Sequence, residues 1–177
     1  MVPDIALRIE VCRHTLTECL IPALDPGQTL AIEQAHVVVA HLNVIADQID
    51  RVLHFRLADL KGAAALTQEL VDLAAGGEAV TDAAREASAA LEVAEPYLAV
   101  TLPDPAVLQE LMLALKSAAD RLLQASFTDG DETFRKRAAR SVLDRALPTI
   151  TRERVWTRKT GFDPLADSLP SMRDALR

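Results

Sequence analysis

The feature that most constrains the fold is an uninterrupted helical pattern in the first third of the chain. From Thr29 to Lys61 there is neither proline nor glycine, and apolar residues recur every three or four positions. This spacing predicts one continuous α-helix of about 50 Å, which exceeds the usual helix of a small domain. The apolar positions are Ile32, Ala35, Val39, Leu42, Ala46, Ile49, Leu53, Leu57 and Leu60.

Other segments show the same spacing and are bounded by turn-forming residues. Asp104 followed by Pro105 is typical of an N-cap and the first residue of a helix. Gly62 leaves two alternatives open, because residues 63–75 either continue the long helix or form a separate one. We therefore predict five to six helices. Apart from the long one, they run from Asp4 to the turn at 22–27, from Thr81 to the turn at 101–105, from Pro105 to about Phe127, and from residue 132 to Pro148.

The last part of the chain lacks a long helical period and carries Pro164 and Pro170. We predict one helical-bundle domain over residues 1–150. An irregular C-terminal arm over residues 151–177 is expected to pack on the bundle or on a partner. The expected fold is an all-α, mostly antiparallel bundle with the long helix at its centre.

Composition and charge exclude several classes of protein. Aromatic residues make up 3% of the chain and glycines number 6, a balance that favours helices over a β-sandwich or barrel. The formal charge of -7 disfavours phosphate backbones and anionic lipid, so we do not expect nucleic acid or a membrane as partner. No stretch reaches about 18 uncharged apolar residues and the N-terminus lacks a basic leader, which predicts a soluble cytoplasmic protein.

Sequence motifs for catalysis are absent. No G-x-S-x-G, P-loop or G-x-G-x-x-G occurs, and we predict no catalytic residue. Cys12 and Cys19 lie seven positions apart. In a helix this separates them by about 10 Å, too far for a disulfide. Both fall on the apolar stripe of the first helix, so we expect two reduced, buried thiols.

The four histidines raise the question of a metal site. Glu33 and His36 have an E-x-x-H spacing, which resembles half of the ferritin-like di-iron signature. That signature implies a second Glu-x-x-His on another helix, and no histidine follows His54. A site shared across a symmetric dimer stays open, but we predict no metal and no cofactor. One further set steps by four along the first helix, opposite its apolar stripe, where solvated residues belong: Glu10, His14 and Glu18.

A line of polar residues runs along the long helix beside its apolar face. Its members are His36, Asn43, Asp47, Asp50 and His54. Such a line can lie in a groove between helices and bind a small ligand, with a histidine as general base. It can equally be the hydrated flank of an amphipathic helix. These five residues are the candidate ligand-binding residues.

Charge is distributed unevenly along the chain. Residues 1–131 hold 8 basic and 20 acidic side chains, whereas residues 132–177 hold 11 basic and 6 acidic ones. The densest basic cluster surrounds one indole and consists of Arg152, Arg154, Trp156, Arg158 and Lys159. The cluster either packs on the acidic helices of its own or a neighbouring subunit, or it binds an anionic ligand or partner.

A second apolar line lies on the long helix, on the side away from the main stripe, and consists of Val37, Val44 and Phe55. A helix that is apolar on two sides is covered on both, so we expect a homodimer that forms through these residues. Burial under the last helix or the arm of the same chain is the alternative. The favoured function is a non-catalytic interaction or scaffold protein. The alternatives are a small-ligand-binding protein or enzyme, and a protein that binds an anion through its basic C-terminal segment.

Overall fold

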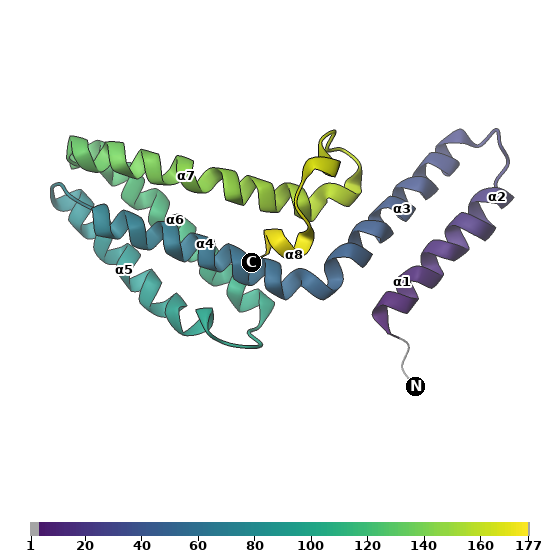
Figure 1. Cartoon of the computed structure of the whole chain (residues 1–177), viewed down its shortest axis with the longest axis horizontal. Coiled ribbons are helices and arrows are strands. Elements are labelled where there is room, and N and C mark those ends of the chain that lie inside the picture. The colour runs from purple at the N-terminus through teal and green to yellow at the C-terminus, as the bar shows by residue number, and fades with distance from the viewer. Residues whose placement is uncertain (1–3, 177) are drawn as a thin grey trace. The chain divides into compact units, whose positions relative to one another are not determined.

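Helices account for most of the computed structural model (Figure 1), which describes residues 4–176. No strand occurs among these residues, and the predicted all-α fold is confirmed. The α-helices are α1 (Ile5–His14), α2 (Ile21–Ala23), α3 (Thr29–Gln48), α4 (Val52–Leu73), α5 (Glu78–Leu98), α6 (Pro105–Asp129), α7 (Glu132–Thr157) and α8 (Met172–Ala175). A π-helical turn, η1 (Thr15–Leu20), joins α1 to α2, and 3-10 turns are η2 (Ile49–Arg51), η3 (Arg158–Thr160) and η4 (Ala166–Ser168).

The predicted long helix is present and extends further than its sequence pattern required. Helical residues continue from Thr29 to Leu73, with only the 3-10 turn η2 between α3 and α4. Gly62 lies inside α4, so residues 63–73 continue the helix and do not form a separate one. A Cβ atom at Gly62 would meet nothing closer than 3.5 Å, which shows that the position imposes no turn.

Backbone contacts divide the chain into two compact units. The first comprises the residues up to Val52 together with Glu153–Ala175, and the second comprises Leu53–Arg152 with Leu176. The unit boundaries therefore fall within α4 and α7. The expected division into residues 1–150 and 151–177 groups the chain differently, and it stays a prediction about domains.

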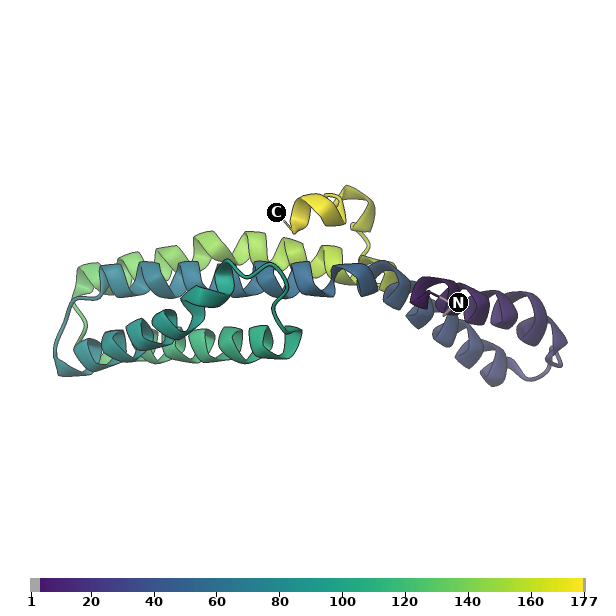
Figure 2. The same ribbon diagram turned by 90° about the horizontal axis from the view of Figure 1, so that it is seen from below.

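In the second unit, α4 to α7 lie side by side as an antiparallel four-helix bundle (Figure 2). Two clusters of buried side chains fill it, and each fully buried leucine stabilises the bundle by about 1.5–3 kcal/mol. One cluster draws on all four helices and includes Leu70, Ala87, Leu122 and Phe134. The other draws on α4, α5 and α6 and includes Leu60, Ala94, Leu108 and Leu115.

The turns at one end of this bundle interlock. Gly76 and Gly130 form an isolated antiparallel bridge between the α4–α5 turn and the α6–α7 turn. The Gly77 N–H donates to the Asp129 carbonyl oxygen at 3.0 Å. A Cβ atom on Gly76 would lie 2.6 Å from that same oxygen, so the two backbones approach too closely for any side chain.

Asp129 also caps a helix that is distant in sequence. Its carboxylate accepts hydrogen bonds from the backbone N–H groups of Ala79 at 2.8 Å and Val80 at 3.1 Å. These groups belong to the first turn of α5, where N–H donors have no partner within the helix. The C-terminal end of α6 therefore stabilises the N-terminal end of α5 through one side chain.

The start of α6 agrees with its predicted cap. Asp104 has an extended backbone, and its Oδ1 accepts from the Ala106 N–H at 2.8 Å, with Pro105 as the first helical residue. The helix ends at Asp129, two residues later than expected. A local pattern of residue types was sufficient here because the cap is built from neighbouring residues.

The predicted end of the last helix at Pro148 is wrong, because α7 continues through Pro148 to Thr157. A proline inside a helix costs about 3 kcal/mol or more through the lost hydrogen bond and the ring clash. Ion pairs on both sides of Pro148 hold α7 against α4: Arg145 lies 2.8 Å from Glu69, and Arg152 lies 2.9 Å from Asp59. These tertiary contacts oppose the local cost, so the helix is not broken.

The predicted irregular arm consequently begins at Arg158 instead of residue 151. Gly161 follows the turn η3 with a φ of 79°, a left-handed conformation that favours glycine. Arg154 donates to Asp163 through Nε at 2.8 Å and Nη2 at 3.1 Å, which ties this segment back to α7. The guanidinium of Arg154 lowers the pKa of Asp163, helped by the Leu165 N–H, and Asp163 in turn raises the pKa of Arg154.

Candidate interaction surface

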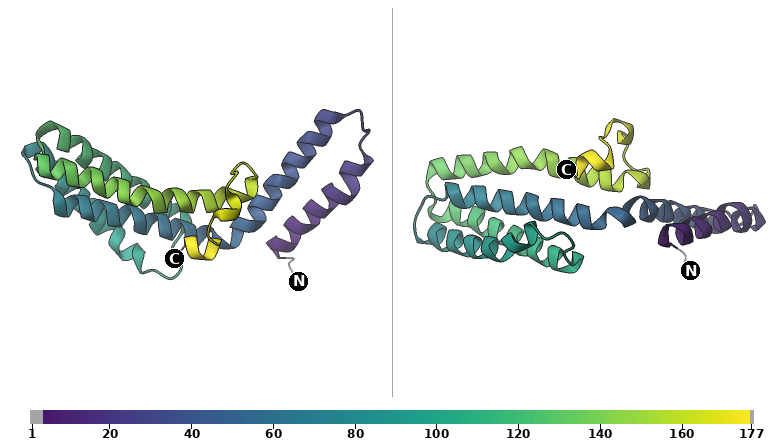
Figure 3. Two further views of the ribbon diagram at one scale, coloured as in Figure 1. Left: turned by 45° about the horizontal axis from the view of Figure 1, so that its top comes forward. Right: turned by 60° about the horizontal axis from the view of Figure 1, so that its bottom comes forward.

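In the first unit, α1 and α3 form an antiparallel helical hairpin (Figure 3). The turn between them is closed locally: the Gly27 N–H donates to Asp25 Oδ1 and the Gln28 N–H donates to the Asp25 carbonyl oxygen, both at 2.8 Å. Partly buried residues mark the faces on which the two helices pack. They are Ile9 and Leu16 on the first helix and Ile32, Ala35, Val39 and Leu42 on α3.

The hairpin has no dry core of its own. None of the described residues between Asp4 and His54 is buried, although many of them are apolar. Cys12 and Cys19 are exposed, so the prediction that both thiols are buried is wrong. Their apolar stripe has only one neighbouring helix, and a single neighbour covers part of a stripe and not all of it.

Most of the exposed apolar surface of α3 lies on the face away from the α1 contact. The exposed fractions are 68% for Leu30, 47% for Val37 and Val38, and 44% for Ile45. These residues belong to two lines with seven-residue steps, and a third line of polar residues runs between them. We call the whole strip the α3 seam. It consists of Leu30, Ala31, Gln34, Val37, Val38, His41, Val44 and Ile45.

The α3 seam contains no aspartate, glutamate, lysine or arginine. When residues are placed at 100° intervals around the helix, Glu33 lies next to the edge of the seam and Asp47 lies outside it. A seven-residue repeat of apolar residues with no charged group is typical of a helix that packs against another helix. The α3 seam is therefore the candidate interaction surface, by its composition, spacing and exposure.

The same helix also passes a test of length and apolarity for membrane spans. Among the described residues, Thr29–Leu73 is the one helix long and apolar enough to cross a membrane, and none of the qualifying window is buried. The membrane-span test considers length and composition alone. On α3, polar Gln34 and His41 lie in the middle of the α3 seam.

The structure separates the three residues predicted to form a dimer interface. Val37 is 47% exposed and Val44 is partly exposed, and both belong to the α3 seam. Phe55 is only 9% exposed. For Phe55, the structure therefore agrees with the alternative that the sequence left open, namely burial within the same chain. The apolar line missed Leu30, Val38 and Ile45, which the seven-residue steps would have revealed.

The predicted polar line is only partly brought together. His36, Asp50 and His54 are exposed. Asn43 and Asp47 line an open cavity of about 460 Å³ with Ala46 and with Lys159, a residue predicted for a different site. The sequence could not show that η3 lies beside α3.

One carboxylate oxygen in this cavity is unusual. Asp47 Oδ2 is buried and has no hydrogen-bond partner, and Asp47 Oδ1 lies 3.9 Å from Arg51 Nη1. Arg51 Nη1 donates instead to the Asp47 carbonyl oxygen at 2.6 Å. A buried oxygen without a partner costs free energy, because it has lost its contact with water and has gained no donor.

The basic cluster is largely engaged within the chain. Arg152 and Asp59 form an ion pair whose side chains are only 13% and 12% exposed, and Arg154 pairs with Asp163. Trp156 is partly buried, and its backbone carbonyl oxygen accepts a hydrogen bond from Gln48 Nε2 at 2.8 Å. Arg158 and Lys159 line a cavity of about 270 Å³ that also contains Asp167. These pairs favour packing within the chain over an external anion.

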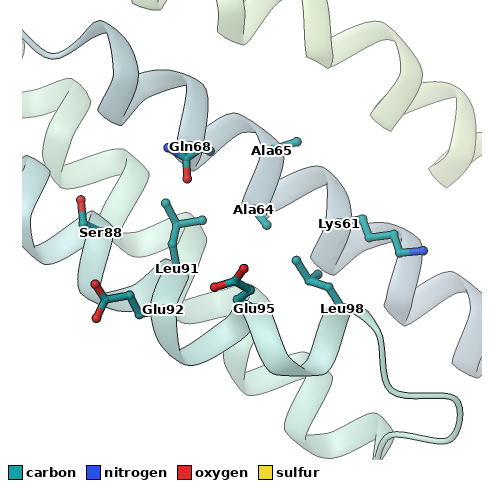
Figure 4. A pocket seen from close by; sticks show the side chains of 9 residues that line it. All are labelled: Lys61, Ala64, Ala65, Gln68, Ser88, Leu91, Glu92, Glu95 and Leu98. Atoms are coloured by element: carbon teal, nitrogen blue, oxygen red, sulfur yellow. The ribbon is translucent and has the colours of Figure 1, made fainter.

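A further groove lies between α4 and α5 (Figure 4) and was not predicted. Its volume is about 470 Å³, and Leu91 and Leu98 extend from α5 toward Ala64 of α4. Small alanines on α4 create the space, and Lys61, Glu92 and Glu95 supply charge at its rim. The Ser88 hydroxyl donates to the Ala84 carbonyl within its own helix, so the groove offers little fixed polar chemistry.

No group of three or more histidine, cysteine, aspartate or glutamate side chains lies close enough to hold a metal ion among residues 4–176.

The fold and surface define an all-α protein with a packed helical bundle and an exposed helical hairpin. The chain matches no known family model, no curated protein and no solved structure.

Proposed function

We propose that this chain is a non-catalytic interaction protein that acts as a homodimer. In this proposal the α1–α3 hairpin is the docking element, and the four-helix bundle is the scaffold that carries it. The observation that supports it is the α3 seam, a strip of six apolar and two polar residues on a hairpin with no buried residue among those described. A second hairpin would supply the layer of packing that this one lacks.

The exposed apolar residues of the seam supply part of the free energy that association needs. Full burial of a valine, leucine or isoleucine contributes about 1.5–3 kcal/mol, so covering a half-exposed one contributes about 1 kcal/mol. Leu30, Val37, Val38 and Ile45 together therefore supply about 4 kcal/mol per chain, or about 8 kcal/mol per dimer, before the cost of association.

The distribution of charge limits contact between two copies to the seam. Residues 4–48 hold six acidic and two basic side chains, so two hairpins repel each other over most of their surface. The seam carries none of these charges. Two copies can thus meet there without placing like charges in direct contact.

Light scattering at tens of micromolar tests the proposal. We expect a dimer for the natural sequence and a monomer for Val38→Asp, which places a carboxylate in the seam. Val93→Asp is the matched control, because Val93 is 61% exposed on α5 and lies outside the seam. Circular dichroism should show equal helix content for all three proteins. A monomeric natural protein overturns the proposal. In that case, vesicle binding that Val38→Asp abolishes would assign the seam to a lipid surface.

A second candidate function is the binding of a small molecule that donates hydrogen bonds. Buried Asp47 Oδ2 has no partner, and Asn43 and Lys159 line the same cavity. An amine or amide of the ligand would satisfy that oxygen. Native mass spectrometry of the purified protein should then show a bound small molecule that Asp47→Ala removes, while Asp50→Ala, at an exposed position, retains it.

A further inference from the structure

We infer that the two α3 helices of the dimer pair antiparallel, with a two-fold axis that passes between Val37 and Val38 of each chain. This inference rests on the proposed homodimer and adds its topology and register. Symmetric dimers use the same surface of both subunits, so each residue of the seam must fit the residue that the axis places opposite it.

The order of residues along the seam satisfies this requirement. With the axis between Val37 and Val38, Leu30 lies opposite the partner's Ile45, and Val37 lies opposite the partner's Val38. Ala31 lies at the same level as the partner's Val44, on the opposite edge of the seam. Every apolar member of the seam thus shares its level with an apolar member.

The two polar members of the seam meet each other. Gln34 lies opposite the partner's His41, and the two-fold axis creates this pair twice. The amide of glutamine and the imidazole each carry a donor and an acceptor, so they can satisfy one another when the seam is covered. Isolated polar pairs within an apolar helix interface are a known device that fixes register.

Neighbouring antiparallel registers lose this match. A shift by one helical turn in one direction places Gln34 opposite the partner's Val37 and Glu33 opposite the partner's Val38. A shift in the other direction places Gln34 opposite the partner's Ile45. Either shift covers polar groups with apolar ones, which leaves them without partners at a cost of about 1–3 kcal/mol each.

A parallel pair is disfavoured by charge. In register, it brings Glu33 beside the partner's Glu33 at the edge of the seam, and it aligns the two helix dipoles in the same direction. The antiparallel arrangement separates the two Glu33 side chains toward opposite ends. The helix dipoles then oppose each other, which is the favourable arrangement.

Cysteine cross-linking tests the register. The parent protein carries Cys12→Ser and Cys19→Ser, because both native thiols are exposed. Leu30→Cys and Ile45→Cys are made separately in this parent and mixed under mild oxidation. We expect the mixture to form covalent dimers several-fold more than either variant alone, since only the mixture places two thiols at opposed positions. Leu113→Cys, at an exposed site on α6, should not cross-link with either variant.

Each other outcome overturns the inference in a distinguishable way. Covalent dimers of Leu30→Cys alone would show a parallel pair. A dimer by light scattering with no cross-linking in any seam variant would keep the proposed function and reject this register. If the parent protein and the natural protein are both monomers, the proposed function and the register are rejected together.

Discussion

Asp129 offers the sharpest test of how the four-helix bundle is held together. Its carboxylate accepts from the N–H groups of Ala79 and Val80 at the start of α5, and its carbonyl oxygen accepts from Gly77. Asp129→Ala removes only the carboxylate, so the backbone bridge between the turns can remain. The variant therefore isolates one side chain that links the end of α6 to the start of α5.

The expected loss is about 2 kcal/mol in the free energy of unfolding. Loss of a side-chain cap costs about 0.5–2 kcal/mol. Loss of the negative charge at a helix N-terminus adds about 0.3–1 kcal/mol. For a chain of this size, about 2 kcal/mol lowers Tm by roughly 4–8 °C. Asp129→Asn keeps one oxygen acceptor and should lose about half as much.

Urea unfolding followed by circular dichroism measures this loss directly. Asp120→Ala is the matched control, because Asp120 is exposed on the same helix. The reasoning is refuted if the free energies of unfolding of Asp129→Ala and Asp120→Ala differ by no more than about 0.5 kcal/mol. A lower midpoint for Asp129→Ala with an unchanged slope would support it.

Three further predictions concern the same bundle. Gly76→Ala should destabilise the bundle by about 1–3 kcal/mol, because the new Cβ would lie 2.6 Å from a backbone oxygen. Gly62→Ala, inside α4, should stabilise the bundle by about 0.5–1 kcal/mol. Thermal unfolding of the two variants distinguishes these effects. Asp59→Ala should lower the free energy of unfolding by about 3 kcal/mol, because it leaves the nearly buried Arg152 unpaired. The double variant Asp59→Leu with Arg152→Met should recover most of this loss in urea unfolding. An equal loss in both proteins would contradict the prediction. Hydrogen bonds from Ser141 and Arg145 lower the pKa of Glu69 below its ordinary value of 4.5, so this stabilisation is present above pH 4.5 and is lost as the pH falls through the lowered pKa. Ser141→Ala should weaken the dependence of Tm on pH in that range, and an unchanged dependence would count against this role of Ser141.

Features built from neighbouring residues were predictable from the sequence. The apolar period between Thr29 and Lys61 predicted the long helix, and Asp104 with Pro105 predicted the start of α6. In both cases the interactions that decide the structure lie within a few residues along the chain. Local spacing and capping chemistry are then sufficient.

Features that depend on distant residues were not predictable in the same way. Pro148 carries a strong local signal for a helix end, yet Glu69 and Asp59 of α4 hold the arginines on either side of it. The interlocked turns depend on Gly76 and Asp129, whose meeting no local pattern indicates. Tertiary contacts of this kind outweigh a local preference through their sum over the whole helix, although no single one of them matches the local signal.

The candidate site shows the same limit. The polar line was identified on one helix, but only Asn43 and Asp47 reach a cavity, because the position of η3 decides which residues are covered. The basic cluster was recognised by its density, whereas its partners Asp59 and Asp163 could not be assigned without the fold. Residue type predicted the candidate side chains, and packing decided which of them line a cavity and which form ion pairs within the chain.

The helices α3 and α4 differ in how much of their apolar surface the chain itself buries. Both helices carry the same apolar period, yet α4 buries Leu60, Thr67 and Leu70 whereas α3 buries none of its residues. The difference lies in their neighbours, because α4 packs with three helices of its unit and α3 forms a hairpin with the first helix. The apolar surface of α3 therefore exceeds what its own unit covers. A charge on the α3 seam should weaken association and spare the bundle, whereas a charge at buried Ala63 should unfold the bundle itself.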